Sequence, residues 1–152
     1  MLTKIKKLRQ KGGGSFAIVA SQYNALYVDA MLNAARAELK RARATVKIVR
    51  VPGAYEVPVV AVKLARTKQF SAIICLGVIL RGETVHAQHI GDSVSRALMQ
   101  IQLETEVPVI HEVLLLESKE QAHVRCMDKK HNRGMEAAQT ALCMARVISE
   151  LG

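Results

Sequence analysis

Short apolar runs and helical apolar stripes alternate along most of this chain. Residues 16–20 form a continuous apolar run, which is typical of a parallel strand buried on both faces. The segment after it repeats its apolar positions with helical spacing, at Val28, Met31, Leu32, Ala35 and Leu39. Residues 46–51 predict a second strand, closed by the turn signal Pro52-Gly53. Pro58 then stands near the start of a second helix, where its missing N–H costs nothing.

The second half of the chain continues the alternation. Residues 72–76 predict a third strand, followed by a glycine-containing loop over residues 77–84. The third helix carries one apolar stripe, at Ile90, Val94, Leu98 and Ile101. A fourth strand within residues 107–116 and a short helix over 117–125 follow. The last helix begins near Asn132 and is expected to turn these residues inward: Ala138, Ala141, Leu142, Ala145 and Ile148.

Strands that alternate with helices predict a parallel sheet covered on both faces. We therefore expect an α/β fold, a single-domain three-layer α/β/α sandwich with a four-stranded, flavodoxin-like sheet. Ligands in such folds collect at the carboxyl ends of the strands. The unusual loops of this chain follow its strands: residues 21–24, 52–56, 78–85 and the segment after His111. This arrangement points to a site without naming its chemistry.

Composition agrees with one compact domain. The 152 residues are 50% hydrophobic but only 3% aromatic, so the core must be aliphatic. No apolar run reaches about 18 residues, the length that a transmembrane helix needs. The N-terminus also lacks the apolar stretch of a secretory signal. The three cysteines are odd in number and widely spaced, which favours neither a disulfide framework nor a CxxC metal site. We expect no membrane partner and a reducing, cytoplasmic compartment.

The net charge of +9 is concentrated at one end of the chain. Residues 1–14 contain five lysines or arginines and no acid, and the remaining residues carry +4. Such an arm either binds nucleic acid or is a solvated, flexible tail that ends at the three glycines 12–14. No aromatic residue interleaves its lysines to stack on a base, which favours the tail. We expect an arm over residues 1–14, a domain over 15–152, and no nucleic-acid partner.

The segment from Gly77 to His86 holds the most informative candidate chemistry. A strand, a glycine-containing loop and a helix N-terminus follow one another, and free N–H groups at such a terminus favour an anion. Thr84 offers a hydroxyl to a phosphate, and His86 stands in the first helical turn, where it could transfer protons. The alternative is that Thr84 caps the helix and His86 is an ordinary surface histidine.

Two further loops offer ligand contacts. Tyr55 and Glu56 follow a strand directly, where an aromatic ring could pack against a ligand and a carboxylate could accept hydrogen bonds from its hydroxyls. Alternatively, Tyr55 belongs to the core and Glu56 favours the next helix N-terminus. Tyr23, in the first loop, could form a stacking wall.

The C-terminal region adds candidate anion contacts at Arg125 and in the stretch 132–136, although surface arginines often bind nothing specific. The cysteines are most simply small buried hydrophobes. The histidines show no zinc-ligand spacing, so we expect no metal site.

Four blocks of this sequence resemble the signatures of one known family, 6,7-dimethyl-8-ribityllumazine synthase. They are Val51-Pro-Gly-Ala-Tyr-Glu-Val-Pro58, Gly82-Glu-Thr-Val-His86, Glu120-Gln-Ala122 followed by Arg125, and Asn132-Arg-Gly-Met-Glu-Ala-Ala138. The blocks occur in the family's order and spacing, and the resemblance covers about residues 15–150.

The resemblance implies an enzyme of riboflavin biosynthesis that needs no cofactor. It would condense two small substrates, 5-amino-6-ribitylaminouracil and 3,4-dihydroxy-2-butanone 4-phosphate, with release of phosphate and water. It also implies a homo-oligomer with sites between subunits: a pentamer, a decamer or an icosahedral shell of pentamers. The alternative is a homologue that binds a flavin, a lumazine or a phosphate-bearing ligand with weak or no turnover.

The resemblance also assigns roles to individual residues. His86 would be the general acid and base. The pyrimidine substrate would contact Tyr23, Ala54, Tyr55, Glu56, Val78, Ile79, Leu80 and His111. The phosphate would contact Glu83, Thr84 and Arg125, the last from a neighbouring subunit. Arg133 and Glu136 would support this part of the site.

Three residues depart from the family's pattern. His111 stands where the family typically has Phe, Glu112 where Gly is common, and Arg133 where Lys is usual. An imidazole can stack on a pyrimidine as a phenyl ring does, but it is polar and titratable. We expect catalysis to survive these changes, because His86, Thr84, Glu56 and Arg125 are all present.

Overall fold

The computed structural model of this protein describes residues 13–82 and 85–152. The strands and helices follow one another in the order β1 (Ser15–Ser21), α1 (Ala25–Arg41), β2 (Thr45–Val51), the 3₁₀ turn η1 (Ala54–Glu56), α2 (Val57–Arg66), β3 (Ala72–Leu80), α3 (His86–Thr105), β4 (Val109–Leu116), α4 (Lys119–Met127) and α5 (Arg133–Leu151). The basic arm expected over residues 1–14 lies almost wholly outside the described residues.

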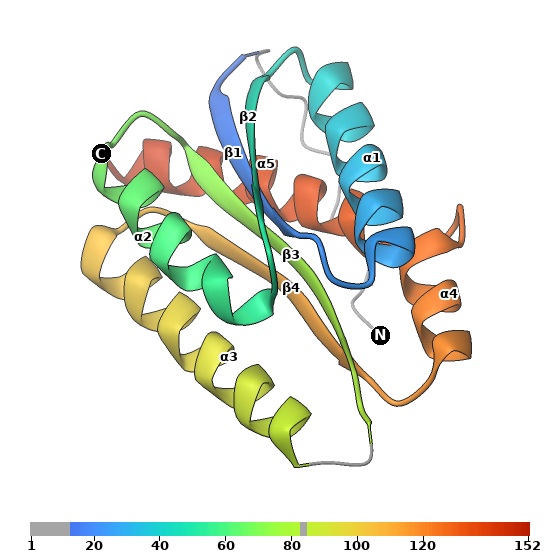
Figure 1. Cartoon of the computed structure of the whole chain (residues 1–152). Helices are drawn as coiled ribbons and strands as arrows, with labels where there is room; N and C mark the ends of the chain where they lie inside the picture. Colours follow the sequence, from blue (N-terminus) through green and yellow to red (C-terminus); the bar gives the residue numbers. More distant parts are fainter. Residues whose placement is uncertain (1–12, 83–84) are drawn as a thin grey trace.

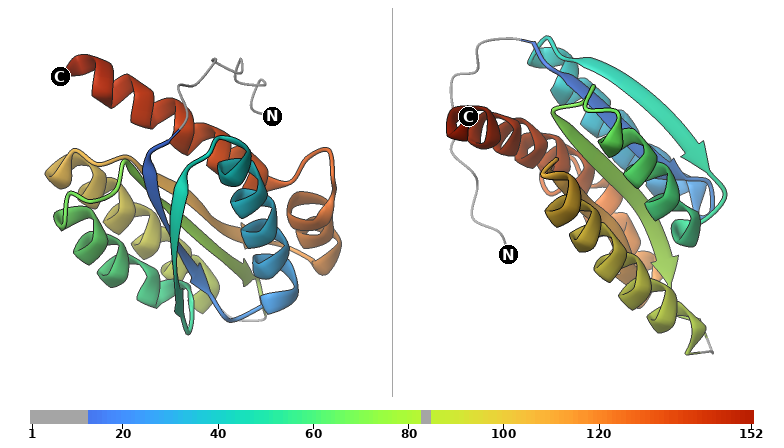
Figure 2. Two further views of the ribbon diagram at one scale, coloured as in Figure 1. Left: turned by 90° about the horizontal axis from the view of Figure 1, so that it is seen from above. Right: turned by 90° about the vertical axis from the view of Figure 1, so that its left-hand side faces the viewer.

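The described strands form one parallel sheet in the order β2-β1-β3-β4. Helices α1, α4 and α5 pack on one face, and α2 and α3 pack on the other (Figure 1). The side views show the same three layers (Figure 2). The predicted α/β sandwich with a four-stranded parallel sheet is therefore confirmed.

The two central strands explain the continuous apolar runs in the sequence. Along β1, Phe16 and Ile18 face the layer of α1 and α5, whereas Ala17 and Val19 face the layer of α2. All four side chains are almost completely buried. A strand covered on both faces needs apolar residues at every position, because successive side chains point to opposite faces.

Two local predictions are wrong. The loop expected to begin at Gly77 is strand, because β3 continues to Leu80 and pairs there with Val113–Leu116 of β4. A Cβ at Gly77 would lie 3.1 Å from Ser21 Oγ and 3.2 Å from Val113 Cγ1, so this glycine marks a close approach rather than a turn. Ile148 does not face the core, because the C-terminal turns of α5 project beyond the rest of the fold (Figure 2).

None of the helices among the described residues is both long and apolar enough to span a bilayer.

Candidate active site

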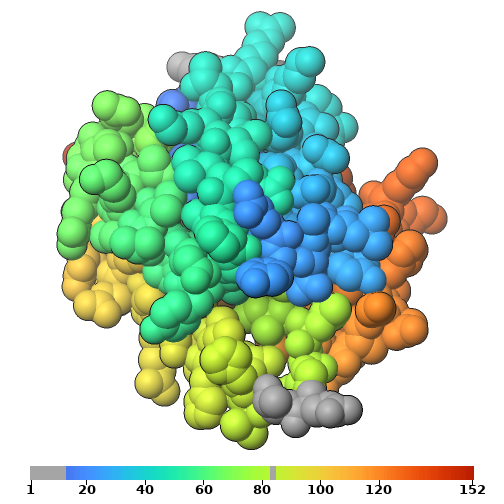
Figure 3. Space-filling view, in the orientation of Figure 1, coloured from blue at the N-terminus to red at the C-terminus, as the bar shows by residue number. Residues whose placement is uncertain are grey.

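A cavity of about 750 Å³ opens at the carboxyl end of the sheet. The loops after β1 and β2, the last residues of β3 and the first turns of α3 enclose it. Its lining is Tyr23, Asn24, Gly53, Ala54, Tyr55, Glu56, Val78, Ile79, Leu80, His86, His89, Ile90 and Ser93. In Figure 3 the segments around residues 20–25, 50–57, 78–82 and 85–93 meet on one face of the molecule.

Hydrogen bonds fix these loops to one another. The backbone N–H of Tyr23 donates to the carbonyl of Pro52 at 3.0 Å, which joins the end of β1 to the end of β2. The Asn24 side-chain amide donates to the carbonyl of Val78 at 2.7 Å, which joins β1 to β3. The walls of the cavity are therefore held together by contacts between three strand ends.

Gly53 brings an aromatic ring and a carboxylate into the same corner of the cavity. A Cβ at this position would lie 3.1 Å from Tyr23 Cδ2 and 3.0 Å from Glu56 Oε2. The two side chains therefore flank the Gly53 backbone, and a larger residue would push them apart. Tyr55 is 66% exposed, so the alternative that it belongs to the core is wrong.

His86 begins α3 and lies exposed at the cavity. The first N–H groups of a helix have no intrahelical acceptor, so this terminus is suited to an anion. His89 lines the same cavity one helical turn further on. The predicted phosphate contacts Glu83 and Thr84 lie outside the described residues, and so does the alternative that Thr84 caps the helix.

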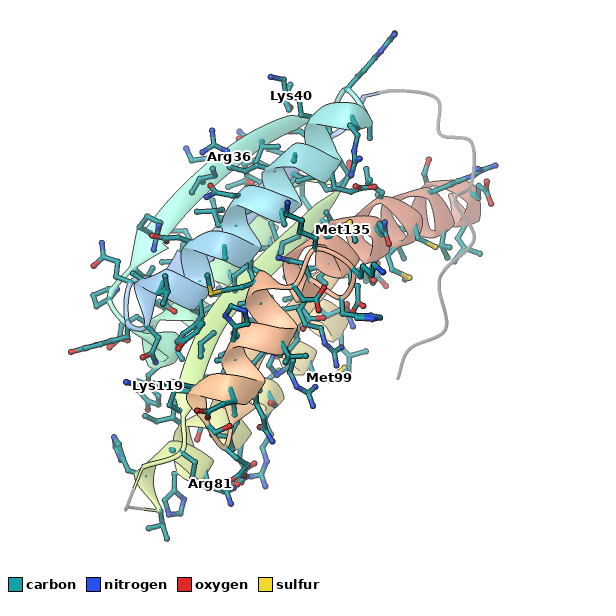
Figure 4. All side chains as sticks on the ribbon, turned by 90° about the vertical axis from the view of Figure 1, so that its right-hand side faces the viewer. Arg36, Lys40, Arg81, Met99, Lys119 and Met135 are labelled. Atoms are coloured by element: carbon teal, nitrogen blue, oxygen red, sulfur yellow. The ribbon has the colours of Figure 1, made fainter. Side chains whose placement is uncertain are left out.

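A second group of predicted residues lies on the opposite face of the sheet. Arg125 stands on α4, Arg133 and Glu136 on α5, and Glu112 points from β4 toward them. Arg133 Nη1 is 3.5 Å from Glu136 Oε2. Figure 4 views this side of the molecule, with Lys119 on α4 and Met135 on α5 labelled.

Burial dominates the electrostatics of this second group. It raises the pKa of Glu112 to about 7, and the negative charge of Glu136 acts in the same direction. The positive charges of Arg133 and Arg125 oppose the shift without cancelling it. Glu112 therefore exchanges its proton near neutral pH, beside two arginines that are candidates for binding an anion.

His111 belongs to neither group. It points from β4 toward α3, where its Nε2 lies 2.7 Å from Ser95 Oγ.

Within one chain the structure thus brings together eight of the predicted residues: Tyr23, Ala54, Tyr55, Glu56, Val78, Ile79, Leu80 and His86. It leaves His111, Arg125, Arg133 and Glu136 outside that cavity.

Sequence reasoning did not single out five residues of the lining. Asn24 adopts a left-handed backbone (φ 57°), a conformation that asparagine tolerates better than most residues. His89 and Ser93 follow His86 at helical spacing, so a helical projection of the segment would have found both. Gly53 and Ile90 complete the lining. Gly53 belongs to the block 51–58, in which only Ala54, Tyr55 and Glu56 were predicted to contact the substrate.

Comparison with known proteins decides the family. The family model described as 6,7-dimethyl-8-ribityllumazine synthase matches residues 13–149. This chain belongs to that family. A protein named 6,7-dimethyl-8-ribityllumazine synthase from Desulfotalea psychrophila is 41% identical over 142 residues, which cover 91% of this chain and 92% of that protein. Two proteins of the same name, from Stenotrophomonas maltophilia strains R551-3 and K279a, are each 39% identical over 147 residues, or 95% of both chains.

Two of the three thiols of this lumazine synthase family member are shielded. Cys75 and Cys126 are buried, and burial raises their pKa values to about 12 and about 11. A thiol reacts through its thiolate, so neither cysteine suits nucleophilic catalysis. Across residues 13–82 and 85–152, no three His, Cys, Asp or Glu side chains gather in a way that could hold a metal ion.

Proposed function

We propose that this protein condenses 5-amino-6-ribitylaminouracil with 3,4-dihydroxy-2-butanone 4-phosphate to 6,7-dimethyl-8-ribityllumazine, releasing phosphate and water. This is the penultimate step of riboflavin biosynthesis. The observation that carries the proposal is the cavity in which His86, Tyr23 and Glu56 meet at the carboxyl end of the sheet. Family membership and the names of the relatives support the same reaction.

The cavity suits the pyrimidine substrate. Tyr23 offers a ring on which the pyrimidine stacks, and its packing against Gly53 holds that ring at the cavity wall. Glu56 accepts hydrogen bonds from ribityl hydroxyls, and Ala54 and Tyr55 complete this side. Val78, Ile79 and Leu80 supply a strand end whose backbone and apolar side chains line the space for the ring.

His86 moves the protons of the reaction. Schiff-base formation, elimination of phosphate and ring closure each need a proton delivered or removed, which a histidine can do near neutral pH. The two substrates also have to be held in reacting geometry, which accounts for a large part of catalysis in a condensation of small molecules. None of these steps requires a redox or metal cofactor.

The phosphate site is completed by a second copy of the chain. Glu83 and Thr84 shortly precede α3 in the sequence, and α3 begins at the cavity, whereas Arg125 and Arg133 lie on the other face of the sheet. A neighbouring copy that presents its edge strand β4, with His111 on one side and Arg125, Arg133 and Glu136 on the other, would supply the missing contacts. Arginine suits this role because its planar fork donates two parallel hydrogen bonds to a phosphate.

Exposed apolar surface supports such an assembly. Met99 is 55% and Leu103 is 71% exposed on α3, and both line a shallow groove of about 590 Å³. Contiguous apolar surface of this kind usually marks an interface. We propose a pentamer, to which decamers or a shell of pentamers would add further contacts.

The rest of the chain is consistent with an enzyme of a reducing compartment, for which we propose the cytoplasm. All three cysteines are free thiols. The family match begins at residue 13, which supports a division into a basic arm over 1–14 and a catalytic domain over 15–152.

The purified protein, mixed with both substrates, tests the proposed function. The absorbance of the lumazine product and the release of inorganic phosphate are followed together. We expect one phosphate per lumazine, at a rate far above that of the substrates alone. Binding of the lumazine without any turnover would contradict the proposal and leave a ligand-binding homologue.

A further inference from the structure

Both ring nitrogens of His111 have hydrogen-bond partners. Nε2 lies 2.7 Å from Ser95 Oγ on α3. Nδ1 accepts a hydrogen bond from the backbone N–H of Val113 at 3.1 Å. A backbone N–H can only donate, so Nδ1 must be unprotonated. The neutral ring then carries its proton on Nε2 and donates it to the serine hydroxyl.

The backbone partner of His111 follows from the position of β4 at the edge of the sheet. The carbonyls of Pro108 and Leu116 accept bonds from residues of β3 and of the turn after it, so the even-numbered residues of β4 direct their backbone groups toward β3. The N–H of Val113 therefore faces outward, where no strand of the described residues pairs with it. The imidazole covers this N–H.

The surroundings of His111 favour the neutral ring. Burial lowers its pKa, and no charged group of the described residues contributes to the shift. On the adjacent strand its register partner is Cys75, whose thiol stays protonated. α3 carries Asp92 and Arg96 within one turn of Ser95, and neither acts on the ring. Protonation of Nδ1 would place its N–H opposite the N–H of Val113 and break the hydrogen bond between them.

We propose that Ser95 is a positioning residue that accepts the Nε2–H of neutral His111 and fixes the orientation of its ring, so that the imidazole presents a fixed aromatic face to the pyrimidine substrate. This inference rests on the proposed function, in which His111 of one copy contacts the substrate bound to another. A ring held by hydrogen bonds at both nitrogens cannot rotate freely, which reduces the ordering that substrate binding requires. A phenyl ring in its place would be held by packing alone and would not need the serine.

The first experiment reads the tautomer directly. Histidine side chains are labelled with ¹⁵N, and the His111 signals are assigned by their loss in His111→Phe. We expect Nδ1 to show the shift of an unprotonated nitrogen and Nε2 that of a protonated one at neutral pH. In Ser95→Ala Nδ1 should stay unprotonated, because the Val113 N–H still donates to it, whereas the Nε2 proton should exchange faster with water. A protonated Nδ1 in the wild-type protein would overturn the inference, and this readout does not depend on turnover.

The second experiment is a double-mutant cycle on turnover. Ser95→Ala should raise KM for the pyrimidine substrate about three- to tenfold and change kcat by less than about twofold, because the serine orients a binding surface. In the His111→Phe background the same change should leave KM unaltered. Ser149→Ala, an exposed serine near the end of α5, is the matched control and should change neither constant.

The two experiments separate the possible failures. An equal rise of KM in the wild-type and His111→Phe backgrounds would show that Ser95 does not act through His111, and would overturn the inference. Absence of lumazine formation by the wild-type protein would instead contradict the proposed function, while the ¹⁵N shifts would still decide the tautomer.

Discussion

Gly134, in the first turn of α5, lies directly against the backbone of Met31 in α1. A Cβ at Gly134 would stand 2.0 Å from the Met31 carbonyl oxygen, a separation that no rotamer change can relieve. In Figure 4 the adjacent residue, Met135, marks the place where α5 passes α1. This contact sets the start of α5, and with it the positions of Arg133 and Glu136.

Replacing Gly134 with alanine should therefore separate two helices. We expect Gly134→Ala to lower the free energy of unfolding by about 3 kcal/mol or more, because backbone must move to admit the methyl group. Gly91→Ala is the matched control, since its Cβ would meet Leu115 Cδ2 at 3.6 Å, an ordinary contact. That change should be neutral or stabilise α3 by up to about 1 kcal/mol. Urea unfolding measures both, and equal stability of the two variants would contradict the close approach.

Asn132 should contribute more stability than an ordinary helix cap. Its Oδ1 accepts from the N–H groups of Gly134 (2.7 Å) and Met135 (3.2 Å), and its Nδ2 donates to the Cys126 carbonyl (2.6 Å). Because the side chain is buried, Asn132→Ala leaves all three partners without a bond and should cost about 2–4 kcal/mol. The half-buried cap Ser118, whose Oγ accepts from the N–H of Gln121, should cost about 1 kcal/mol when altered to alanine in the same unfolding assay. A smaller loss for Asn132→Ala than for Ser118→Ala would be inconsistent with this network.

Glu112 should make stability depend on pH. Burial raises the pKa of its carboxyl from an ordinary value of 4.5 to about 7, so between these values the folded protein holds a proton that the unfolded chain releases. The free energy of unfolding should therefore fall as pH rises from about 5 to 8, by up to about 3 kcal/mol from this group. Glu112→Gln cannot titrate and should lose this part of the pH dependence. Unfolding curves at pH 5 and 8 test it, and parallel pH profiles for the two proteins would refute the assignment.

The division of the predicted residues between two faces of the sheet predicts complementation. His86→Gln and Arg125→Ala should each be nearly inactive as pure assemblies. When equal amounts are unfolded together and reassembled, about a quarter of the shared sites would combine an intact His86 with an intact Arg125. We expect activity near that fraction of the wild-type value. A mixture no more active than its components would mean that both residues act within one chain.

The alternation of apolar runs predicted the layers of this fold because each central strand is buried on both faces, as Phe16 and Ala17 illustrate. It also predicted that the loops holding Tyr23, Glu56 and His86 would meet, since the carboxyl ends of parallel strands share one edge. Gly77 was misread because a glycine at a close approach and a glycine in a turn have the same sequence signature.

Other features depend on tertiary contacts that no local pattern encodes. The pairing of His111 with Ser95 joins residues 16 positions apart on different elements. The burial of Glu112 among charged neighbours depends on how α4 and α5 cover β4. In the proposed assembly Arg125 acts at the cavity of a second chain, so a single sequence could assign its role only through the family resemblance.

The rate of lumazine formation by the wild-type protein, beside His86→Gln and His89→Gln, tests the central claim most directly. The two histidines line the same cavity one helical turn apart, so His89→Gln controls for the replacement of an imidazole by an amide there. We predict that His86→Gln lowers kcat about 100-fold, whereas His89→Gln changes it less than about threefold. Wild-type turnover no faster than the uncatalysed reaction, or equal losses in the two variants, would contradict the account.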